Sequence, residues 1–161
     1  MKSVIRTAVF DLDGTLVRTE AIAAQMLEEA LARRGVRLAP EDRNVAVGRT
    51  WAAAMDRLTP KYLQVADRPG FTADVLGSYR ARISQGVEVV PGAVACVRAL
   101  AASMPVALVS GSSREEIEII LHGLGILGCF QFFLGAEDYP KSKPAPDGYQ
   151  KAFRQLGVQG G

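Results

Sequence analysis

The sequence predicts an α/β fold in which a parallel sheet carries an inserted, all-helical cap. Short apolar runs with the pattern of buried strands alternate with helical patterns toward both ends of the 161-residue chain. Residues 18–87, which lie between them, show helical patterns and no convincing strand. The 48% content of hydrophobic residues is ample for a buried core. We therefore expect residues 1–17 and 88–161 to form the core and the stretch between them to form the cap.

The first strand is predicted at residues 7–10, an apolar run that ends in turn-forming residues. The carboxyl ends of parallel strands open onto the crevice where ligands bind. Asp11 and Asp13 follow this run, and because residues two apart on an extended chain project to the same side, both carboxylates can face one ligand. Gly14 permits the sharp turn that follows. Taken alone, this segment fits equally well a solvated turn whose carboxylates accept hydrogen bonds from backbone N–H groups.

Two carboxyl groups at one strand end suit phosphoryl transfer. An Asp carboxylate can attack phosphorus to form an aspartyl-phosphate. A second carboxyl group nearby can protonate the leaving oxygen and later deprotonate water. The two roles require two acids, which the segment supplies.

Helical patterns fill the stretch assigned to the cap. The clearest one covers residues 20–34, where apolar residues recur at helical spacing. Weaker patterns cover residues 49–58 and 73–83. Breaks between them are predicted at Pro60 and at the Pro69-Gly70 pair.

The remainder of the chain alternates helix and strand, which predicts parallel strands with helices on both faces of the sheet. The predicted elements are a helix over 93–102, a strand over 105–109, a helix over 114–122, a strand over 130–134, and a helix from 146 or 147 to 156.

Small polar residues follow the second core strand. Ser110 ends this strand as Asp11 ends the first, and the residues after it lead into a helix whose free N–H groups can bind phosphate. Ser112 or Ser113 is expected to cap that helix. Capping and phosphate binding are compatible, so this loop is a second candidate element of the site.

A stiff loop near the end of the sequence carries Lys143. Pro144 and Pro146 restrict its backbone, and Asp147 suits the start of the last helix. The ammonium group of Lys143 is a compact positive charge that can offset a nucleophilic carboxylate and the oxygens of a phosphoryl group. From composition alone a loop lysine is more commonly a solvated surface charge, which is the expectation for Lys141.

These three segments, in this order, resemble the motifs of the haloacid dehalogenase superfamily of phosphohydrolases, in particular its phosphoglycolate phosphatase and β-phosphoglucomutase-like branch. The matching segments are residues 11–16, 109–113 and 143–147. The resemblance covers nearly the whole chain and implies a Rossmann-like core with a helical cap.

The resemblance implies a role for each matching residue. Asp11 would be the nucleophile, Asp13 the general acid/base, Ser110 a phosphate-binding hydroxyl, and Lys143 the charge stabiliser. It also implies Mg²⁺, bound by Asp11 and by the main-chain carbonyl of Asp13, because a hard dication relieves the repulsion between two carboxylates and a phosphate dianion. Further phosphate-binding candidates in these loops are Leu12, Gly14, Thr15, Gly111 and Ser112.

One family motif has no counterpart in the sequence. Relatives continue beyond the lysine loop into another strand that ends in an acidic pair, which would supply a further metal ligand. Glu137 and Asp138 precede the loop and do not replace this pair. The resemblance therefore implies a core truncated at its C-terminus by at least a strand–helix unit, roughly 30 residues. We expect weak or absent Mg²⁺-dependent activity and an open sheet edge beside the first strand.

Three explanations of this shortened core remain open at this point. The chain is a truncated product, or a second molecule completes the exposed sheet edge, or the protein is a short relative that has lost catalysis.

The cap is expected to select the substrate, since a cap closes over the site and contacts the leaving group. Arg49 either binds a second anionic group of the substrate or is a solvated arginine at a helix start. The function indicated is a Mg²⁺-dependent phosphatase of small phosphorylated metabolites. The alternatives are a sugar-phosphate mutase and a non-catalytic binding or regulatory protein. The cap candidates are Thr19, Glu20, Gly48, Arg49 and Thr50.

Net charge and hydrophobicity limit the classes of binding partner and the cellular location that we expect for the protein. The net charge of +2 is too small to predict binding to nucleic acid or to a membrane surface. No apolar run approaches the ~20 residues of a transmembrane helix, and the first residues lack a signal-peptide core. We expect a cytoplasmic monomer or homodimer that acts on a small phosphorylated metabolite. Cys96 and Cys129 are expected to be buried free thiols.

Overall fold

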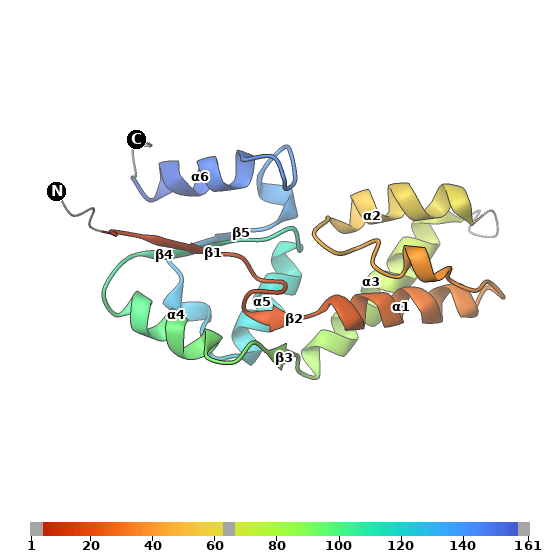
Figure 1. The fold of residues 1–161 in the computed structure, drawn as a ribbon, viewed down its shortest axis with the longest axis horizontal. Helices are drawn as coiled ribbons and strands as arrows, with labels where there is room; N and C mark the ends of the chain where they lie inside the picture. Colours follow the sequence, from red (N-terminus) through yellow and green to blue (C-terminus); the bar gives the residue numbers. More distant parts are fainter. Residues whose placement is uncertain (1–4, 63–66, 158–161) are drawn as a thin grey trace.

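The computed structural model describes residues 5–62 and 67–157 (Figure 1). Three strands, β1 (Ala8–Phe10), β4 (Val106–Val109) and β5 (Phe132–Leu134), form a parallel sheet in the order β1-β4-β5. Within the described residues β1 pairs on one side, with β4. The predicted α/β fold with a parallel sheet is confirmed.

Helices cover both faces of this sheet. α6 (Asp147–Gln155) lies on one face, and α4 (Ala93–Ala101) and α5 (Arg114–Gly123) lie on the other (Figure 1). All residues of β4 are buried. Because successive side chains of a strand point to opposite faces of the sheet, β4 contributes to the packing on both faces. Val106 and Leu108 join the larger hydrophobic cluster, whereas Val109 packs in the smaller cluster with Tyr139 and Ala152 under α6.

The other helices are α1 (Glu20–Ala32), α2 (Trp51–Leu58) and α3 (Arg68–Ser84), and they lie together beside the sheet (Figure 1). α1 and α3 pack along each other through fully buried side chains such as Leu27 and Phe71. The larger cluster runs without interruption from these helices into the layer under β4. The described residues between Glu20 and Ser84 form helices and turns, as predicted, while the domain boundaries at residues 17 and 88 stay a prediction.

A short antiparallel ladder joins the two regions. β2 (Val17–Arg18) pairs with β3 (Glu88–Val89), in the register Val17 to Val89 and Arg18 to Glu88. The expectation of no strand between Val17 and Val87 was therefore wrong at β2. Strands of two residues are too short to show the alternation on which a sequence-based assignment depends.

The Pro69-Gly70 pair does not break a helix. α3 begins at Arg68, so both residues lie in its first turn, where a proline loses no intrahelical hydrogen bond. The Asp67 side chain caps this turn by accepting a hydrogen bond from the Gly70 N–H at 3.0 Å. The predicted break at Pro60 is confirmed, because a 3₁₀ turn at Thr59–Lys61 follows α2.

Two smaller expectations also needed correction. β5 begins at Phe132, because Leu127–Cys129 form a 3₁₀ turn that delays the strand. Cys96 is exposed and Cys129 is half-buried, so the prediction of buried thiols was wrong. α4 buries its Ala93 and Val97 face, which turns Cys96 outward. No helix of residues 5–62 and 67–157 has the length and apolar character needed to cross a membrane.

Gly148, in the first turn of α6, permits close contact between this helix and the sheet. A Cβ atom at this position would lie 2.8 Å from Val109 Cγ1 and 3.0 Å from Tyr139 Cε1. Both neighbours are buried and cannot retreat. We expect Gly148→Ala to lower the free energy of unfolding by about 1–2 kcal/mol, since overpacking costs about 1–3 kcal/mol and alanine returns up to about 1 kcal/mol of helix propensity.

Denaturant unfolding measures this effect, and Gly77→Ala is its matched control. Gly77 is an exposed glycine inside α3, and a Cβ atom there meets nothing within 4 Å. Its substitution should stabilise the protein by up to about 1 kcal/mol. Equal effects of the two substitutions would show that the contact between α6 and β4 is not tight.

Candidate active site

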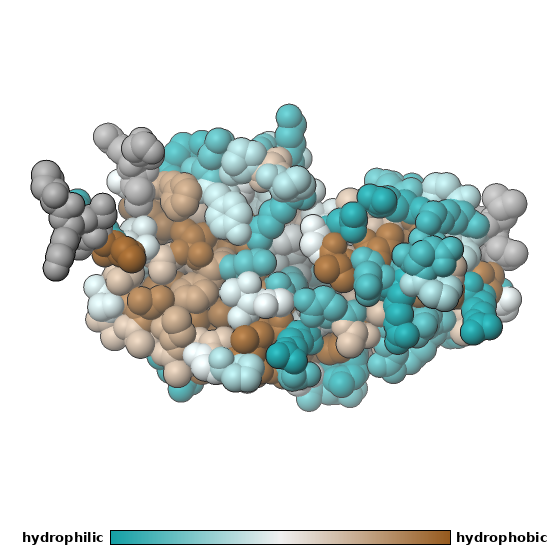
Figure 2. Space-filling model, in the orientation of Figure 1, coloured by the Kyte–Doolittle hydropathy of each residue, from teal (hydrophilic) through white to brown (hydrophobic). Residues whose placement is uncertain are grey.

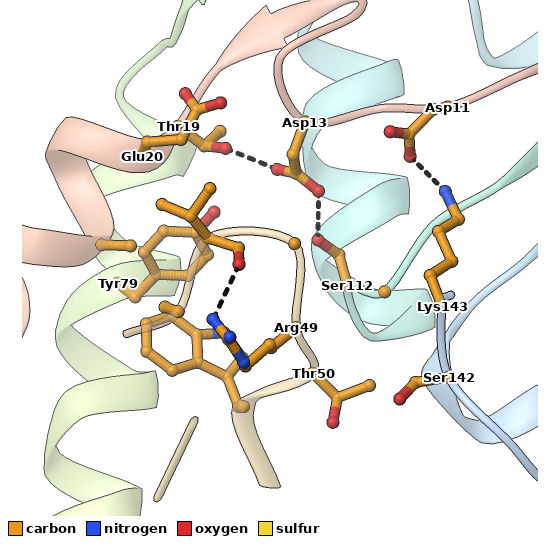
Figure 3. Close-up of a pocket in the computed structure, with 16 residues that line it drawn as sticks. Asp11, Asp13, Thr19, Glu20, Arg49, Thr50, Tyr79, Ser112, Ser142 and Lys143 are labelled. Atoms are coloured by element: carbon orange, nitrogen blue, oxygen red, sulfur yellow. Dashed lines mark hydrogen bonds and ion pairs between the residues drawn. The ribbon is translucent and has the colours of Figure 1, made fainter. Parts of the chain in front are cut away.

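A cavity of about 190 Å³ lies between the carboxyl ends of the core strands and the cap (Figure 3). The core contributes the loops after β1 and β4 and the loop before α6, while the cap contributes the start of α1, the loop before α2, and α3. The side chains and backbone that line it belong to Asp11, Asp13, Thr19, Glu20, Ala23, Ala46, Val47, Gly48, Arg49, Thr50, Trp51, Tyr79, Gly111, Ser112, Ser142 and Lys143.

Asp11 and Lys143 form an ion pair at the core side of the cavity. The Lys143 Nζ donates to Asp11 Oδ1 at 2.7 Å and to the main-chain carbonyl of Val109 at 2.9 Å. It also lies 5.1 Å from the centre of the Tyr149 ring. Three contacts therefore hold the ammonium group against the first carboxylate. Lys141, by contrast, is exposed, as its sequence context indicated.

Asp13 lies in a different environment, among hydroxyl groups. Thr19 donates to its Oδ1, while Ser112 and Ser110 donate to its Oδ2 at 2.8 and 3.2 Å. The two carboxylates of one turn thus have unlike partners, an ammonium group for Asp11 and hydroxyl groups for Asp13. Unlike environments of this kind allow two carboxylates to take separate chemical roles.

The turn after β1 leaves backbone groups free at the site. The carbonyl of Leu12 accepts from the N–H groups of Thr15, Leu16 and Val17, and the buried Leu12 side chain anchors the turn. Within the described chain, the N–H groups of Leu12, Asp13 and Gly111 donate no hydrogen bond, and the Asp13 carbonyl accepts none. Unpaired N–H groups beside a cationic side chain suit an anion, which agrees with the phosphate-binding expectation for these loops.

The start of α5 shows which serine caps the helix. The Ser113 Oγ accepts from the Glu116 N–H at 3.3 Å, and the Ser113 N–H donates to Glu116 Oε2 at 2.9 Å, which completes a capping box. Ser112 is therefore free to donate to Asp13. Of the two serines that the sequence left open, Ser113 is the cap and Ser112 faces the cavity.

Burial raises the pKa of three groups around this site. Burial, with a smaller contribution from Asp11, raises the pKa of Tyr139 to about 12, and its hydroxyl donates to the Ser110 carbonyl at 2.6 Å. Burial is also the main cause that raises the pKa of Tyr79, with a further contribution from Asp13. The pKa of Glu116 is raised by its burial as well. The Tyr139 hydroxyl therefore stays protonated near neutral pH and can donate to the Ser110 carbonyl.

Most of the predicted site residues line the cavity, and four do not. Those on the cavity wall are Asp11, Asp13, Glu20, Gly48, Arg49, Gly111, Ser112 and Lys143. Ser110 is fully buried, and its hydroxyl reaches Asp13 from beneath. The Leu12 side chain lies in the core, while Gly14 and Thr15 are exposed on the outer part of the turn. Gly14 and Thr15 do not line the cavity, because the chain has already turned away from it, and their predicted role in phosphate binding stays a prediction.

Arg49 is bound to its own loop. Its guanidinium group donates to the main-chain carbonyls of Val45 and Val47 at 3.3 and 3.2 Å. Figure 3 shows the side chain on the cap side of the cavity, away from the Asp11–Lys143 pair. Arg49 is exposed, and these contacts hold its guanidinium group on the cap side, away from the core carboxylates.

Sequence reasoning missed two aromatic residues of the cavity, Trp51 and Tyr79. Their rings lie 5.1 Å apart in a T-shaped arrangement. Tyr79 shares helical spacing with the buried Val75 and Ile83, so the pattern predicts only a core position. Trp51 follows Thr50 at the start of α2, and its place beside two cap candidates was the one available signal.

The oxygen atoms at the site fit a hard metal ion in part. The Asp11 carboxylate and the unpaired Asp13 carbonyl are donors of the kind that Mg²⁺ prefers. The described residues contain no cluster of three or more His, Cys, Asp or Glu side chains that could hold a metal ion. Since Mg²⁺ commonly combines one or two carboxylates with water and phosphate oxygens, two protein donors suit an ion that is shared with a bound phosphate.

The fold and this site define an α/β protein with a helical cap over a pocket that holds a carboxylate–ammonium pair, a second carboxylate and unpaired N–H groups. The family model of haloacid dehalogenase-like hydrolases matches residues 5–161. The chain belongs to this family, and the expected Rossmann-like core with a cap is that of its structural relatives.

Curated relatives agree with this assignment. A bifunctional riboflavin kinase/FMN phosphatase of Arabidopsis thaliana is 28% identical over 158 residues, which cover 97% of this chain and 41% of the relative. A phosphoglycolate phosphatase of Yersinia pseudotuberculosis is 30% identical over 163 residues, which cover 96% of this chain and 68% of the relative. The chain thus spans less than half of the first protein and about two thirds of the second.

Solved structures share the fold. The crystal structure of CbbY from Rhodobacter sphaeroides in complex with phosphate has a TM-score of 0.78 and 22% identity, over 96% of this chain and 74% of that one. A hydrolase from Pseudomonas syringae has a TM-score of 0.76 and 21% identity, over 96% of this chain and 72% of that one. These likenesses show that the chain shares the fold of these structures.

Proposed function

We propose that the protein is a Mg²⁺-dependent phosphatase of small phosphorylated metabolites that acts through an aspartyl-phosphate on Asp11. The observation that carries the proposal is the Asp11 carboxylate, which follows β1 into the cavity and is held 2.7 Å from the Lys143 ammonium group. The phosphatase names of the relatives support the reaction class, since they include the Arabidopsis FMN phosphatase and the Yersinia phosphoglycolate phosphatase.

In the first half of the proposed reaction, an Asp11 carboxylate oxygen attacks the phosphorus of a bound phosphate monoester. The phosphorus–oxygen bond to the leaving group breaks, and the phosphoryl group remains on Asp11 as an acyl phosphate. The Lys143 ammonium group and the N–H groups of Leu12, Asp13 and Gly111 balance the charge of the phosphoryl oxygens. Mg²⁺, held by Asp11 and the Asp13 carbonyl, would supply further positive charge.

Asp13 serves both halves of this reaction as general acid and then as general base. Its carboxyl group gives a proton to the leaving oxygen and afterwards removes one from the water that attacks the acyl phosphate. The second attack releases inorganic phosphate and restores Asp11. The hydroxyl groups of Thr19, Ser110 and Ser112 hold the Asp13 side chain in one position for both steps.

The cap side of the cavity supports a small substrate. A volume of about 190 Å³ admits a phosphate group with a few further atoms. Thr19, Glu20, Arg49 and Thr50 supply polar groups around this space, and Trp51 supplies an apolar wall. We assign to these residues the recognition of the leaving group.

Chemical trapping of the phosphorylated carboxylate tests the proposal. The protein is incubated with radiolabelled acetyl phosphate and Mg²⁺, quenched in acid, and treated with hydroxylamine, which cleaves acyl phosphates. We expect a label that hydroxylamine removes and that maps to the peptide containing Asp11. Trapping reports the nucleophile even when later turnover is slow. A label on a serine, or no label under conditions in which the protein binds phosphate, would contradict the proposal.

A further inference from the structure

We propose that Arg80, on the cap helix α3, is a positioning residue for the phosphate-binding loop of the core and acts through the buried carboxylate of Glu116. This inference rests on the proposed function, because it takes residues 110–113 as a loop that binds the phosphoryl group. It adds a residue that no matching motif contains and connects the cap to the part of the core where phosphate would bind.

Two ion pairs join the cap helix α3 to the start of α5. Arg80 Nη1 lies 2.7 Å from Glu115 Oε2, and Arg80 Nε lies 3.8 Å from Glu116 Oε1. α3 packs against α5 and leads from the cap back toward the core (Figure 1). Both glutamates occupy the first turn of α5, directly after residues 110–113. Arg80 therefore holds the first turn of the helix that follows this loop.

The carboxylate of Glu116 is fully buried, which is rare for a charged side chain. Its Oε2 accepts a hydrogen bond from the Ser113 N–H at 2.9 Å. Its Oε1 faces Arg80 Nε, and within residues 5–62 and 67–157 neither of these two buried atoms has a hydrogen-bond partner. A buried carboxylate without a counter-charge is strongly unfavourable, so the Arg80 guanidinium group stabilises Glu116 in this position.

The same carboxylate holds the loop that borders the cavity. Glu116 and Ser113 exchange two hydrogen bonds, which fix the end of this loop. The residue before Ser113 is Ser112, whose hydroxyl group donates to Asp13 at 2.8 Å. The Gly111 N–H, which is unpaired in the described part of the chain, lies one residue further back. A group that fixes Glu116 therefore also positions donors that face the phosphate.

The charge of Glu116 opposes the binding of an anion unless Arg80 offsets it. Burial raises the pKa of Glu116, while its hydrogen bonds with Ser113 and the charge of Arg80 lower it. Arg80 thereby favours the ionised carboxylate and also balances its charge. Without Arg80, the carboxylate would repel a phosphate anion bound at the neighbouring loop. Loss of Arg80 should therefore weaken phosphate binding, and removal of the Glu116 charge should then restore it.

Calorimetric titration with inorganic phosphate in the presence of Mg²⁺ tests this inference without relying on turnover. At mildly alkaline pH, chosen to keep phosphate a dianion and Glu116 ionised, we expect Arg80→Met to weaken phosphate binding about three- to tenfold. Methionine preserves part of the apolar stem of arginine and lacks the guanidinium group. Arg80→Gln should cause a similar loss with a polar side chain. Arg80→Lys retains the charge and should bind phosphate more tightly than either variant.

Glu116→Gln separates an effect of charge from a merely structural role of Arg80. Glutamine can still accept the Ser113 N–H in a capping box, but it carries no charge. Added to Arg80→Met, this substitution should restore most of the lost phosphate affinity. If Arg80 served only to pack α3 against α5, the second substitution would restore nothing.

Arg34→Met is the matched control. Arg34 also pairs with a carboxylate of α3, that of Asp74, at 2.8 Å, and its side chain is 26% exposed, against 33% for Arg80. This pair lies within the cap and does not reach the phosphate-binding loop. Its loss should lower the Tm without changing the Kd for phosphate.

The possible outcomes separate this inference from the proposed function. Wild-type phosphate affinity in Arg80→Met and Arg80→Gln, or a double variant that binds no better than Arg80→Met, overturns the role of Arg80. An equal loss of affinity in Arg34→Met overturns it as well. All three results leave the phosphatase proposal standing. A wild-type protein that binds no phosphate and forms no acyl phosphate overturns both.

Discussion

Asp11→Asn is expected to reduce the hydrolysis of a phosphate monoester by about 10⁴-fold or more, because an amide cannot form the acyl phosphate. Asparagine matches the volume of aspartate, and its carbonyl oxygen can still accept a hydrogen bond from Lys143. Lys143 also keeps its hydrogen bond to the Val109 carbonyl, so we expect the loop before α6 to keep its position. Single-turnover release of 4-nitrophenol, with protein in excess over substrate, measures the loss even when turnover is slow.

Two further variants make this test specific. Asp56→Asn removes an exposed carboxylate that pairs with Arg68 on the cap surface, and it should leave the rate unchanged. Thermal unfolding of Asp11→Asn and Asp56→Asn shows whether each variant keeps the fold. The second variant is Asp13→Asn. Near-normal turnover by Asp11→Asn, together with loss of activity in Asp13→Asn, would indicate that Asp13 is the nucleophile and contradict the assignment.

The core half of the site was predictable because the end of a buried strand is visible in the sequence as an apolar run followed by turn-forming residues. Asp11 and Ser110 each follow an apolar run, and the parallel register of β1 with β4 brings the two ends to the same edge. Lys143 was identifiable from its stiff loop, although the sequence could not supply the 2.7 Å contact with Asp11 that separates it from Lys141.

The cap half of the site was less predictable because cap residues meet the core only through tertiary packing. Tyr79 has the spacing of a core residue, and only the packing of α3 against the core shows that it also lines the cavity. Thr19 was a cap candidate for substrate recognition, yet its hydroxyl group donates to the Asp13 carboxylate of the core. Helical periodicity specifies which face is buried and not what that face contacts.

Local backbone chemistry accounts for the remaining differences. Pro69 is compatible with either a break or a first helical turn, and the Asp67 cap decides in favour of the turn. Gly14 and Thr15 belong to the matching motif, but the bonds that close the turn on the Leu12 carbonyl carry them to the outside. A sequence motif therefore identifies the loop that belongs to the site. The hydrogen bonds within the loop determine which of its residues face the cavity.

Lys143→Met is expected to lower kcat/KM for 4-nitrophenyl phosphate by about 10²- to 10³-fold, the scale for loss of one charge-stabilising group at an active site. Methionine keeps much of the apolar stem and removes the ammonium group, which lies 5.1 Å from the centre of the Tyr149 ring. Asp11 would then face the phosphoryl oxygens without its nearest positive charge, so repulsion raises the barrier to attack.

Lys141→Met, two residues away in the same loop, is the matched control. Lys141 is exposed, so its replacement should change kcat/KM little except through weak, salt-screened attraction of the anionic substrate. The two variants can be compared at low and at high ionic strength. The loss in Lys143→Met should persist at high salt because the Lys143 side chain is only 23% exposed and its pair with Asp11 is poorly screened. Equal, salt-sensitive losses in both variants would show that Lys143 attracts the substrate from the surface and does not act at Asp11.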